Sequence, residues 1–274
     1  KKLKKFQLSH EQFKKLKDIA KKLNLKFIST PLDLDSAKLV KSICDIVKIA
    51  SSDNNFYPLL DFFIKSKKKI IISTGMLSYL DIVNLRKYIL KKITKFELKR
   101  RFCFLYCVTS YPAEKKNTNL NSIKYLKEKT DLNIGYSDHT LGIEACIVAR
   151  ALGANIIEKH FTIDNNFSKF RDHMLSANPK NFKKMVEYIR NTELMLGNLE
   201  KKIQTPEIIF LDQLRRAPYA SKNIIKNNYL DLKNVDFLRP NKILKHSFDL
   251  KNIFEKKAKY NLVKGQLIKP GDIK

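Results

Sequence analysis

The stretch NIGYSDHTLGIEACIVARALGANIIEKHFT, residues 133–162, decides the fold. It begins with one β-rich run, NIGYSDHT, and ends with a second, NIIEKHFT. Between them, residues 141–152 are almost all apolar, which predicts a buried helix that Gly153 stops. A strand, a helix and a second strand in this order predict two neighbouring parallel strands joined by a crossover helix.

The same alternation runs from Lys1 to about Gly197. Further β-rich runs are expected at 26–30, 45–51, 69–74 and 102–111. Caps, prolines and apolar spacing predict helices between them: after Ser9 with a capping box to Gln12, at 36–43, from Pro58, after Ser78, through Leu120, Ile123 and Leu126, and from Pro179 to Leu196. This gives about six β/α units, against the eight of a closed TIM barrel. A flavodoxin-like open sheet also fits the alternation, but no glycine-rich phosphate loop supports it.

The pattern changes after a polar stretch that ends near Leu214. The segments RRAPYASKNI, DFLRPNKI and KKAKYNLVKGQLI are short and lack long helical periodicity. We therefore expect a barrel domain at 1–200, a linker at 201–214 and a small β-rich domain at 215–274.

The composition is strongly basic. The chain of 274 residues has 55 Lys and Arg against 27 Asp and Glu, a formal charge of +28. The lysines are spread along the whole sequence, so we do not expect a nucleic-acid site, although a positive field attracts anionic substrates. The four cysteines lie in apolar runs without C-x-x-C spacing, and no apolar run nears membrane-spanning length. A cytoplasmic protein without membrane contact is expected.

Two tripeptides carry the sharpest chemical signal: Ser137-Asp138-His139 and Glu158-Lys159-His160, each at the end of a predicted strand. Residues i and i+2 of a strand share a face, so the two histidines can converge on one divalent metal. Two unrelated polar strand ends remain an alternative. A Ser-Asp-His hydrolase is excluded, because contiguous strand residues point to alternate faces and cannot hydrogen-bond in series.

A second polar set follows the first three predicted strands. A lysine surrounded by hydroxyl groups can hold a phosphate through charge-assisted hydrogen bonds. The alternative is a lysine at the sheet edge with the hydroxyl residues that commonly end strands. The set comprises Thr30, Lys48, Ser51 and Ser73.

These motifs resemble the N-acetylneuraminate (sialic acid) synthase family. The similar segments, in matching order, are FISTP from Phe27, VKIASSD from Val47, ISTGM from Ile72, CVTSYPA from Cys107, YSDHT from Tyr136 and EKHFT from Glu158. RRAPYASKNI and FLRPNKI are similar to the start of the family's C-terminal antifreeze-like (SAF) domain. The resemblance runs from about Ser9 to the C-terminus.

The resemblance implies a TIM (β/α)8-type barrel with a small SAF domain. It implies condensation of phosphoenolpyruvate with an N-acylmannosamine-type amino sugar, with Mn²⁺ or Mg²⁺ as cofactor, in a domain-swapped homodimer. By motif, His139 and His160 are the metal ligands, and Arg239 reaches the acyl-sugar site of the other subunit. Tyr111, Glu158 and Asp172 face the sugar. The groups that hold phosphoenolpyruvate are Thr30, Lys48, Ser51, Ser73, Thr109 and Ser137.

The sequence departs from the family in several places. The first strand here corresponds to the family's third, so the barrel is expected to lack its first two strands, with their glutamate and Lys-x-Gln. The loop 164–172 reads DNNFSKFRD where many members have Pro-Gly-Pro-Asp, and Thr109 replaces an asparagine. A catalytically inactive remnant or basic binding protein, and a heptulosonate-type synthase, remain alternatives. The sequence leaves the identity of the amino sugar open.

Overall fold

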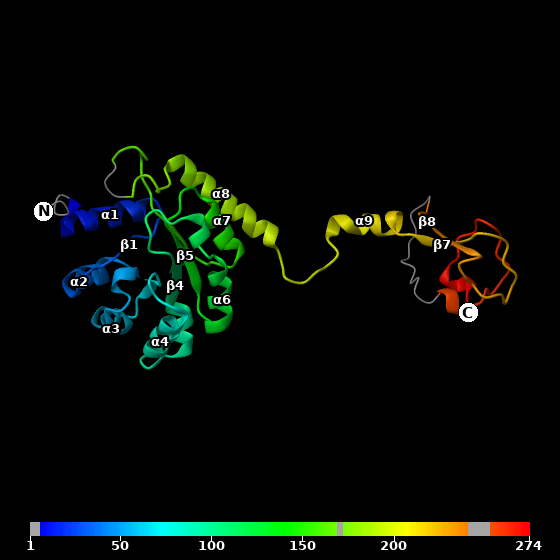
Figure 1. The fold of residues 1–274 in the computed structure, drawn as a ribbon, viewed down its shortest axis with the longest axis horizontal. Helices are drawn as coiled ribbons and strands as arrows, with labels where there is room; N and C mark the ends of the chain where they lie inside the picture. The colour runs from blue at the N-terminus through cyan, green and yellow to red at the C-terminus, as the bar shows by residue number, and fades with distance from the viewer. Residues whose placement is uncertain (1–5, 169–171, 241–252) are drawn as a thin grey trace. The chain divides into compact units, whose positions relative to one another are not determined.

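The computed structural model describes residues 6–168, 172–240 and 253–274 of the chain (Figure 1). The chain divides into two compact units, Lys1–Gly197 and Asn198–Lys274. In the first unit, six strands form one parallel sheet in sequence order, which curls into a half-barrel consistent with a partial TIM barrel. The strands are β1 (Ile28–Ser29), β2 (Ile46–Ile49), β3 (Lys69–Ser73), β4 (Phe102–Cys107), β5 (Ile134–Asp138) and β6 (Ile157–Lys159).

Helices connect the strands, as the alternation predicts. The capping box between Ser9 and Gln12 is present, and Ser78 caps its helix with Asp81. The last helix of the unit runs from Pro179 to Leu196 and ends at Gly197. The described helices are α1 (His10–Lys22), α2 (Leu34–Ile43), α3 (Tyr57–Lys65), α4 (Tyr79–Leu90), α5 (Lys95–Arg101), α6 (Asn121–Thr130), α7 (Glu144–Ala151) and α8 (Pro179–Leu196).

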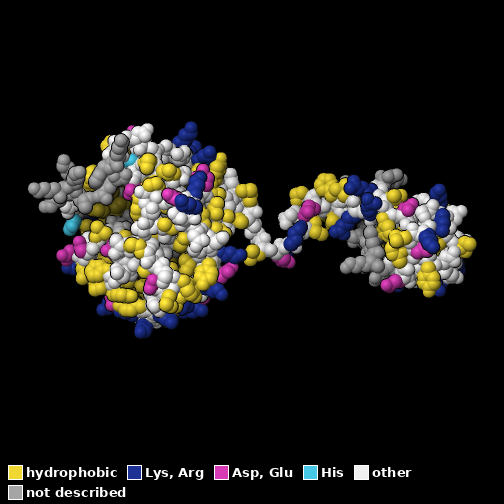
Figure 2. Space-filling model, viewed as in Figure 1, with side chains coloured by type: hydrophobic (Ala, Val, Ile, Leu, Met, Phe, Trp, Pro, Cys, Tyr) yellow, Lys and Arg dark blue, Asp and Glu magenta, His cyan; other side chains and the backbone are white. Residues whose placement is uncertain are grey.

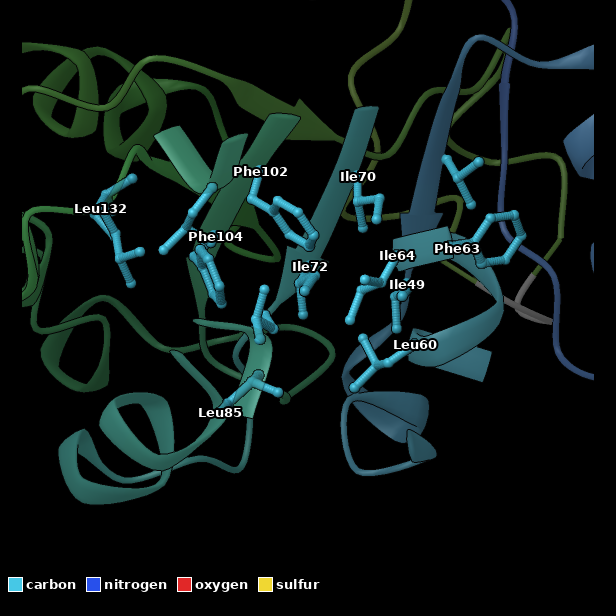
Figure 3. Close-up of a cluster of buried hydrophobic side chains, with 14 of the residues drawn as sticks. Ile49, Leu60, Phe63, Ile64, Ile70, Ile72, Leu85, Phe102, Phe104 and Leu132 are labelled. Atoms are coloured by element: carbon cyan, nitrogen blue, oxygen red, sulfur yellow. The ribbon is translucent and has the colours of Figure 1, made fainter. Parts of the chain in front are cut away.

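The two faces of the sheet have different partners. Ile70 and Ile72 of β3 and Phe104 of β4 pack in the main core with helix residues such as Leu60 and Leu85 (Figure 3). The alternate strand residues form a second cluster, in which Ile71, Cys103 and Leu105 contact other sheet residues. One face is therefore covered by helices, and the other is the inner face of the half-barrel.

Asp61 joins α3 to the end of α4. Its carboxylate accepts hydrogen bonds from the Tyr88 hydroxyl (2.8 Å) and the Lys92 ammonium (2.6 Å). Burial alone would raise the pKa of Asp61, but the hydrogen bonds from Lys92 and Tyr88 outweigh it and hold the pKa below its usual value. These hydrogen bonds therefore stabilise the folded state fully above the unfolded pKa of Asp61, about 4. Their contribution is lost as the pH falls through the pKa of Asp61 in the folded state.

We expect Asp61→Asn to lower the free energy of unfolding by about 1 kcal/mol at pH 7. At pH 3 the difference from the wild type should shrink, because the wild-type carboxyl is then partly protonated. Urea denaturation at both pH values measures this. Asp35→Asn, which removes an exposed pair with Lys38, is the control and should leave stability unchanged. Equal differences at the two pH values would contradict the assignment.

The second unit has a small core of its own. Strands β7 (Ala217–Ala220) and β8 (Val235–Leu238) pair antiparallel, and Leu230, Ile253 and Leu262 are among the buried residues around them. The segment expected to be a linker, 201–214, contains helix α9 (Thr205–Leu214), which has Pro206 as its second residue. The Gln204 backbone amide donates a hydrogen bond to Glu207 Oε2 at its start. Short 3₁₀ turns at Ile253–Glu255 and Pro270–Asp272 complete the described structure.

The basic side chains are dispersed. Figure 2 shows Lys and Arg side chains scattered over the visible face of each unit, between acidic and apolar ones. All four cysteines are buried free thiols. Within the described ranges, no helix combines the length and the apolar character needed to cross a membrane.

Candidate active site

The strand register brings the predicted polar residues to one face of the sheet. Ser73 and Cys107 follow Ile71 and Leu105 by two positions, so they continue the inner face of the half-barrel. Cys107 pairs with Ser137, and Ser137 pairs with Glu158. A row of polar side chains therefore crosses the carboxyl ends of β3 to β6, where barrel enzymes carry their chemistry.

Glu158 links two predicted groups. Its Oε1 accepts a hydrogen bond from the Ser137 hydroxyl at 2.6 Å and lies 3.2 Å from the Lys48 ammonium. The Lys48 side chain is 11% exposed and that of Glu158 is 42% exposed, so the cation is sequestered while the carboxylate faces open space. The phosphate-binding lysine predicted from β2 and the sugar-facing glutamate predicted from β6 thus belong to one cluster.

Both candidate metal ligands lie in a second cluster beside it. The ring centroids of His139 and His160 are 5.5 Å apart, and the Tyr111 ring lies 4.2 Å from His139 and 5.9 Å from His160. Asp172 Oδ2 is 3.7 Å from His160 Nδ1. Of the DNNFSKFRD loop that precedes this contact, residues 169–171 lie outside the described part.

His139 has a fixed orientation. Its Nδ1 lies 2.7 Å from the Val108 carbonyl oxygen. Because a carbonyl only accepts, Nδ1 carries a proton, which leaves Nε2 as the ring nitrogen that can bind a ligand. The main chain is held as well, since the Ala113 amide donates to the His139 carbonyl at 2.9 Å.

Burial sets the protonation of the neighbouring groups. It lowers the pKa of His160, with the nearby His139 acting in the same direction and Asp172 opposing it. Burial is also the main cause that raises the pKa of Tyr111. The nearby Cys107 and the carboxylates of Asp172 and Glu158 raise it further. The site therefore favours a neutral His160 ring and a protonated phenol.

The donor set fits part of a divalent-metal site. Two imidazoles and a nearby carboxylate are ligand types that manganese and related ions accept. In the described ranges, however, no three His, Cys, Asp or Glu side chains lie close enough together to hold an ion alone. His139 and His160 can supply two ligands of such a site, with the others coming from substrate, water or other residues.

A tight corner lies next to Lys48. Ser51 Oγ is 3.3 Å from Cys107 Sγ, and a Cβ on Gly75 would come within 2.1 Å of Thr109 Oγ1 and 2.6 Å of Ser51 Oγ. Ser51 and Thr109 are therefore neighbours only because residue 75 has no side chain. Asn54 holds this corner, because its Nδ2 donates to the carbonyls of Ser73 and Gly75.

The remaining predicted residues are placed as follows. Ser73 is buried at the end of β3, and Thr30 is exposed directly after β1, where Ser29 pairs with Val47. Arg239 is an exposed residue of the second unit and lines a pocket of about 550 Å³ with Tyr219 and Lys264. The structure therefore brings together Lys48, Ser137 and Glu158; Ser51 and Thr109; and Tyr111, His139, His160 and Asp172.

Sequence reasoning did not assign a role to Gly75, although a glycine directly after a strand indicates a close approach. It also missed Asp138 and Lys159, whose side chains lie on the opposite face from the histidines. They form an ion pair of 2.7 Å and are 0% and 1% exposed. Each is the central residue of one of the two tripeptides, and this position could have indicated that they pair.

Comparison with known proteins identifies the family. An uncharacterized protein of Methanocaldococcus jannaschii is 44% identical over 238 residues, 86% of this chain and 69% of that protein. The N,N'-diacetyllegionaminic acid synthase of Campylobacter jejuni is 36% identical over 237 residues, 86% of this chain and 70% of that protein. The crystal structure of N-acetylneuraminic acid (sialic acid) synthetase from Leptospira borgpetersenii in complex with citrate matches with a TM-score of 0.69 and 35% identity, over 76% of this chain and 72% of that one. The model of the NeuB family matches residues 1–201, the greater part of the sequence, and the chain therefore belongs to the NeuB family of N-acetylneuraminate synthases.

Proposed function

We propose that this protein condenses phosphoenolpyruvate with an N-acylmannosamine-type amino sugar, giving a nonulosonic (sialic) acid and phosphate. The observation that carries the proposal is the meeting of Lys48, Ser137 and Glu158 beside His139 and His160, at the carboxyl ends of β2, β5 and β6. The relatives named as legionaminic and sialic acid synthases support the same class of reaction.

In this reaction, C3 of phosphoenolpyruvate forms a bond to the aldehyde carbon of the open-chain sugar. Water adds to C2 and the C–O bond to phosphate breaks. The anion-binding residues hold the phosphate and carboxylate of phosphoenolpyruvate by charge-assisted hydrogen bonds. We assign this task to Thr30, Lys48, Ser51, Ser73, Thr109 and Ser137.

The sugar is assigned to residues that adjoin the anion-binding ones. Glu158, Tyr111 and Asp172 orient its hydroxyl groups, and the protonated Tyr111 phenol donates a hydrogen bond. His139 and His160 would hold Mn²⁺ or Mg²⁺, which supplies Lewis-acid polarisation of the aldehyde oxygen when bound. We further propose a cytoplasmic homodimer in which Arg239, on an SAF-type second domain, completes the site of the other subunit.

The test is phosphate release by the full chain from phosphoenolpyruvate and Mn²⁺ with a panel of N-acylated hexosamines and one phosphorylated sugar. Turnover with an N-acylated hexosamine, absent when Mn²⁺ is replaced by a chelator, supports the proposal and identifies the sugar. Turnover with the phosphorylated sugar alone indicates a heptulosonate-type synthase. A folded chain that releases no phosphate with any sugar indicates a protein that binds without catalysis and overturns the proposal.

Gly75→Ala tests the tight corner. The new methyl group must displace Thr109 and Ser51, because its carbon would lie 2.1 Å from Thr109 Oγ1. We expect kcat/KM for phosphoenolpyruvate to fall on the order of 10–100-fold, mainly through KM, since displacements of about 1 Å have effects of this size. Gly271→Ala, where a Cβ meets no atom within 4 Å, is the control. An unchanged KM in Gly75→Ala would remove Ser51 and Thr109 from the phosphoenolpyruvate site.

A further inference from the structure

The Asp138 carboxylate is held by four donors on the helix-covered side of the sheet. Oδ1 accepts from the Tyr136 hydroxyl (3.1 Å) and the Thr140 amide (2.9 Å). Oδ2 accepts from the Lys159 ammonium (2.7 Å) and the Cys146 thiol (3.3 Å). Burial raises the pKa of Tyr136 and of Cys146, and the negative charge of Asp138 is the second cause in both cases. Both groups therefore stay protonated and act as donors.

Lys159 closes the arrangement from the neighbouring strand. Its ammonium also donates to the Thr140 carbonyl at 2.5 Å, so it contacts the chain on both sides of His139. Asp138 and Lys159 are directly paired in the β5–β6 register. The pair therefore cross-links the two strands one residue before each candidate metal ligand.

Strand β6 is short, and its other side-chain link to β5 is the hydrogen bond from Ser137 to Glu158, whose carboxylate also lies near Lys48. The strand has three residues, and its described ladder consists of three residue pairs with β5. His139 has anchors of its own in Val108 and Ala113. The Ala177 amide donates a hydrogen bond to the His160 carbonyl, and the His160 ring lies 3.7 Å from Asp172. The position of the His160 ring thus depends on how firmly β6 is fixed to β5.

We propose that the Asp138–Lys159 pair is a positioning device that fixes the spacing of His139 and His160. The inference deepens the metal site of the proposed function and rests on it for its chemical purpose. A buried ion pair contributes little net stability, because desolvation offsets the attraction between the charges. Its place between the two ligand strands points to a role in fixing their geometry.

The test uses the near-isosteric double variant Asp138→Asn/Lys159→Met, which removes both charges without leaving one unpaired. Its matched control is Arg150→Met/Glu193→Gln, which removes an ion pair of 2.9 Å between α7 and α8. Circular dichroism and thermal unfolding establish that both variants fold. Two readouts follow: Mn²⁺ affinity by electron paramagnetic resonance, and nuclear Overhauser contacts between the Tyr111, His139 and His160 rings in the metal-free protein.

In the Asp138→Asn/Lys159→Met variant, Mn²⁺ affinity is expected to fall on the order of 10–100-fold. Contacts to the His160 ring should weaken, while the Tyr111–His139 contact persists. The control should match the wild type in both readouts. Unchanged ring contacts in the folded double variant, or equal changes in the control, would overturn the inference. If the wild type binds no Mn²⁺, the metal proposal fails, and the ring contacts alone decide whether the pair positions His160.

Discussion

A His139→Ala variant is expected to release phosphate at least about 10³-fold more slowly than the wild type. The substitution removes one of two candidate metal ligands, and Lewis-acid polarisation of a carbonyl is worth several kcal/mol of transition-state stabilisation. It also removes the ring that contacts Tyr111 at 4.2 Å, so the phenol should lose its orientation toward the sugar. The measurement is kcat with saturating phosphoenolpyruvate and sugar over a range of Mn²⁺ concentrations.

Two further variants separate metal binding from packing. His10→Ala makes the same substitution at an exposed helix start and should leave turnover unchanged. His139→Gln keeps a polar side chain of similar length and should recover part of the activity only at high Mn²⁺ concentration. If His139→Ala retains wild-type turnover and Mn²⁺ dependence, His139 is not a ligand and the metal site must lie elsewhere.

The main residues of the site could be predicted from the sequence, because the alternation of side chains along a strand and the order of the strands can both be read from it. Ser137 and Glu158 are two residues before His139 and His160, and strand alternation alone places each pair on one face. Their strands are consecutive, which predicts that they are neighbours. The structure confirms that the strands are neighbours, since Ser137 pairs with Glu158 in the β5–β6 ladder, and the two histidine rings lie 5.5 Å apart.

The contacts that tune the site could not be predicted in this way. The approach of Gly75 to Thr109 and Ser51 requires three loops to meet, and no local pattern encodes their separation. The pairing of Asp138 with Lys159 depends on the register of two strands, and a slip by one residue would separate them. Strand alternation places both side chains on the face opposite the histidines, but only the folded structure shows that they meet.

Two helices were missed for a different reason. Helix α5 is short and rich in charges, and its apolar residues do not repeat at helical spacing over several turns. Its capping box between Thr94 and Glu97 was nevertheless readable, whereas Gln204 before α9 is not a residue type that predicts a cap. Periodicity finds helices that bury a long face, whereas caps identify short helices whose stability depends on their ends.

Replacing Lys48 by methionine is expected to reduce kcat/KM for phosphoenolpyruvate about 100-fold. Hydrogen bonds to charged groups contribute about 1.5–3 kcal/mol, and a tenfold change in rate corresponds to about 1.4 kcal/mol. The Lys48 side chain is 11% exposed, so water replaces its charge poorly. Lys38→Met, at an exposed lysine paired with Asp35, is the control for loss of one positive charge.

The contact with Glu158 makes the Lys48 result diagnostic. If Lys48 binds the phosphate or carboxylate, Lys48→Met raises KM for phosphoenolpyruvate and leaves KM for the sugar near its wild-type value. If Lys48 serves only to orient Glu158 across their 3.2 Å contact, the sugar KM and kcat change instead, and Glu158→Gln reproduces the effect. In that second case the double variant is no worse than either single one, because both substitutions remove the same interaction. Additive losses, with separate effects on the two KM values, would assign Lys48 to phosphoenolpyruvate and Glu158 to the sugar.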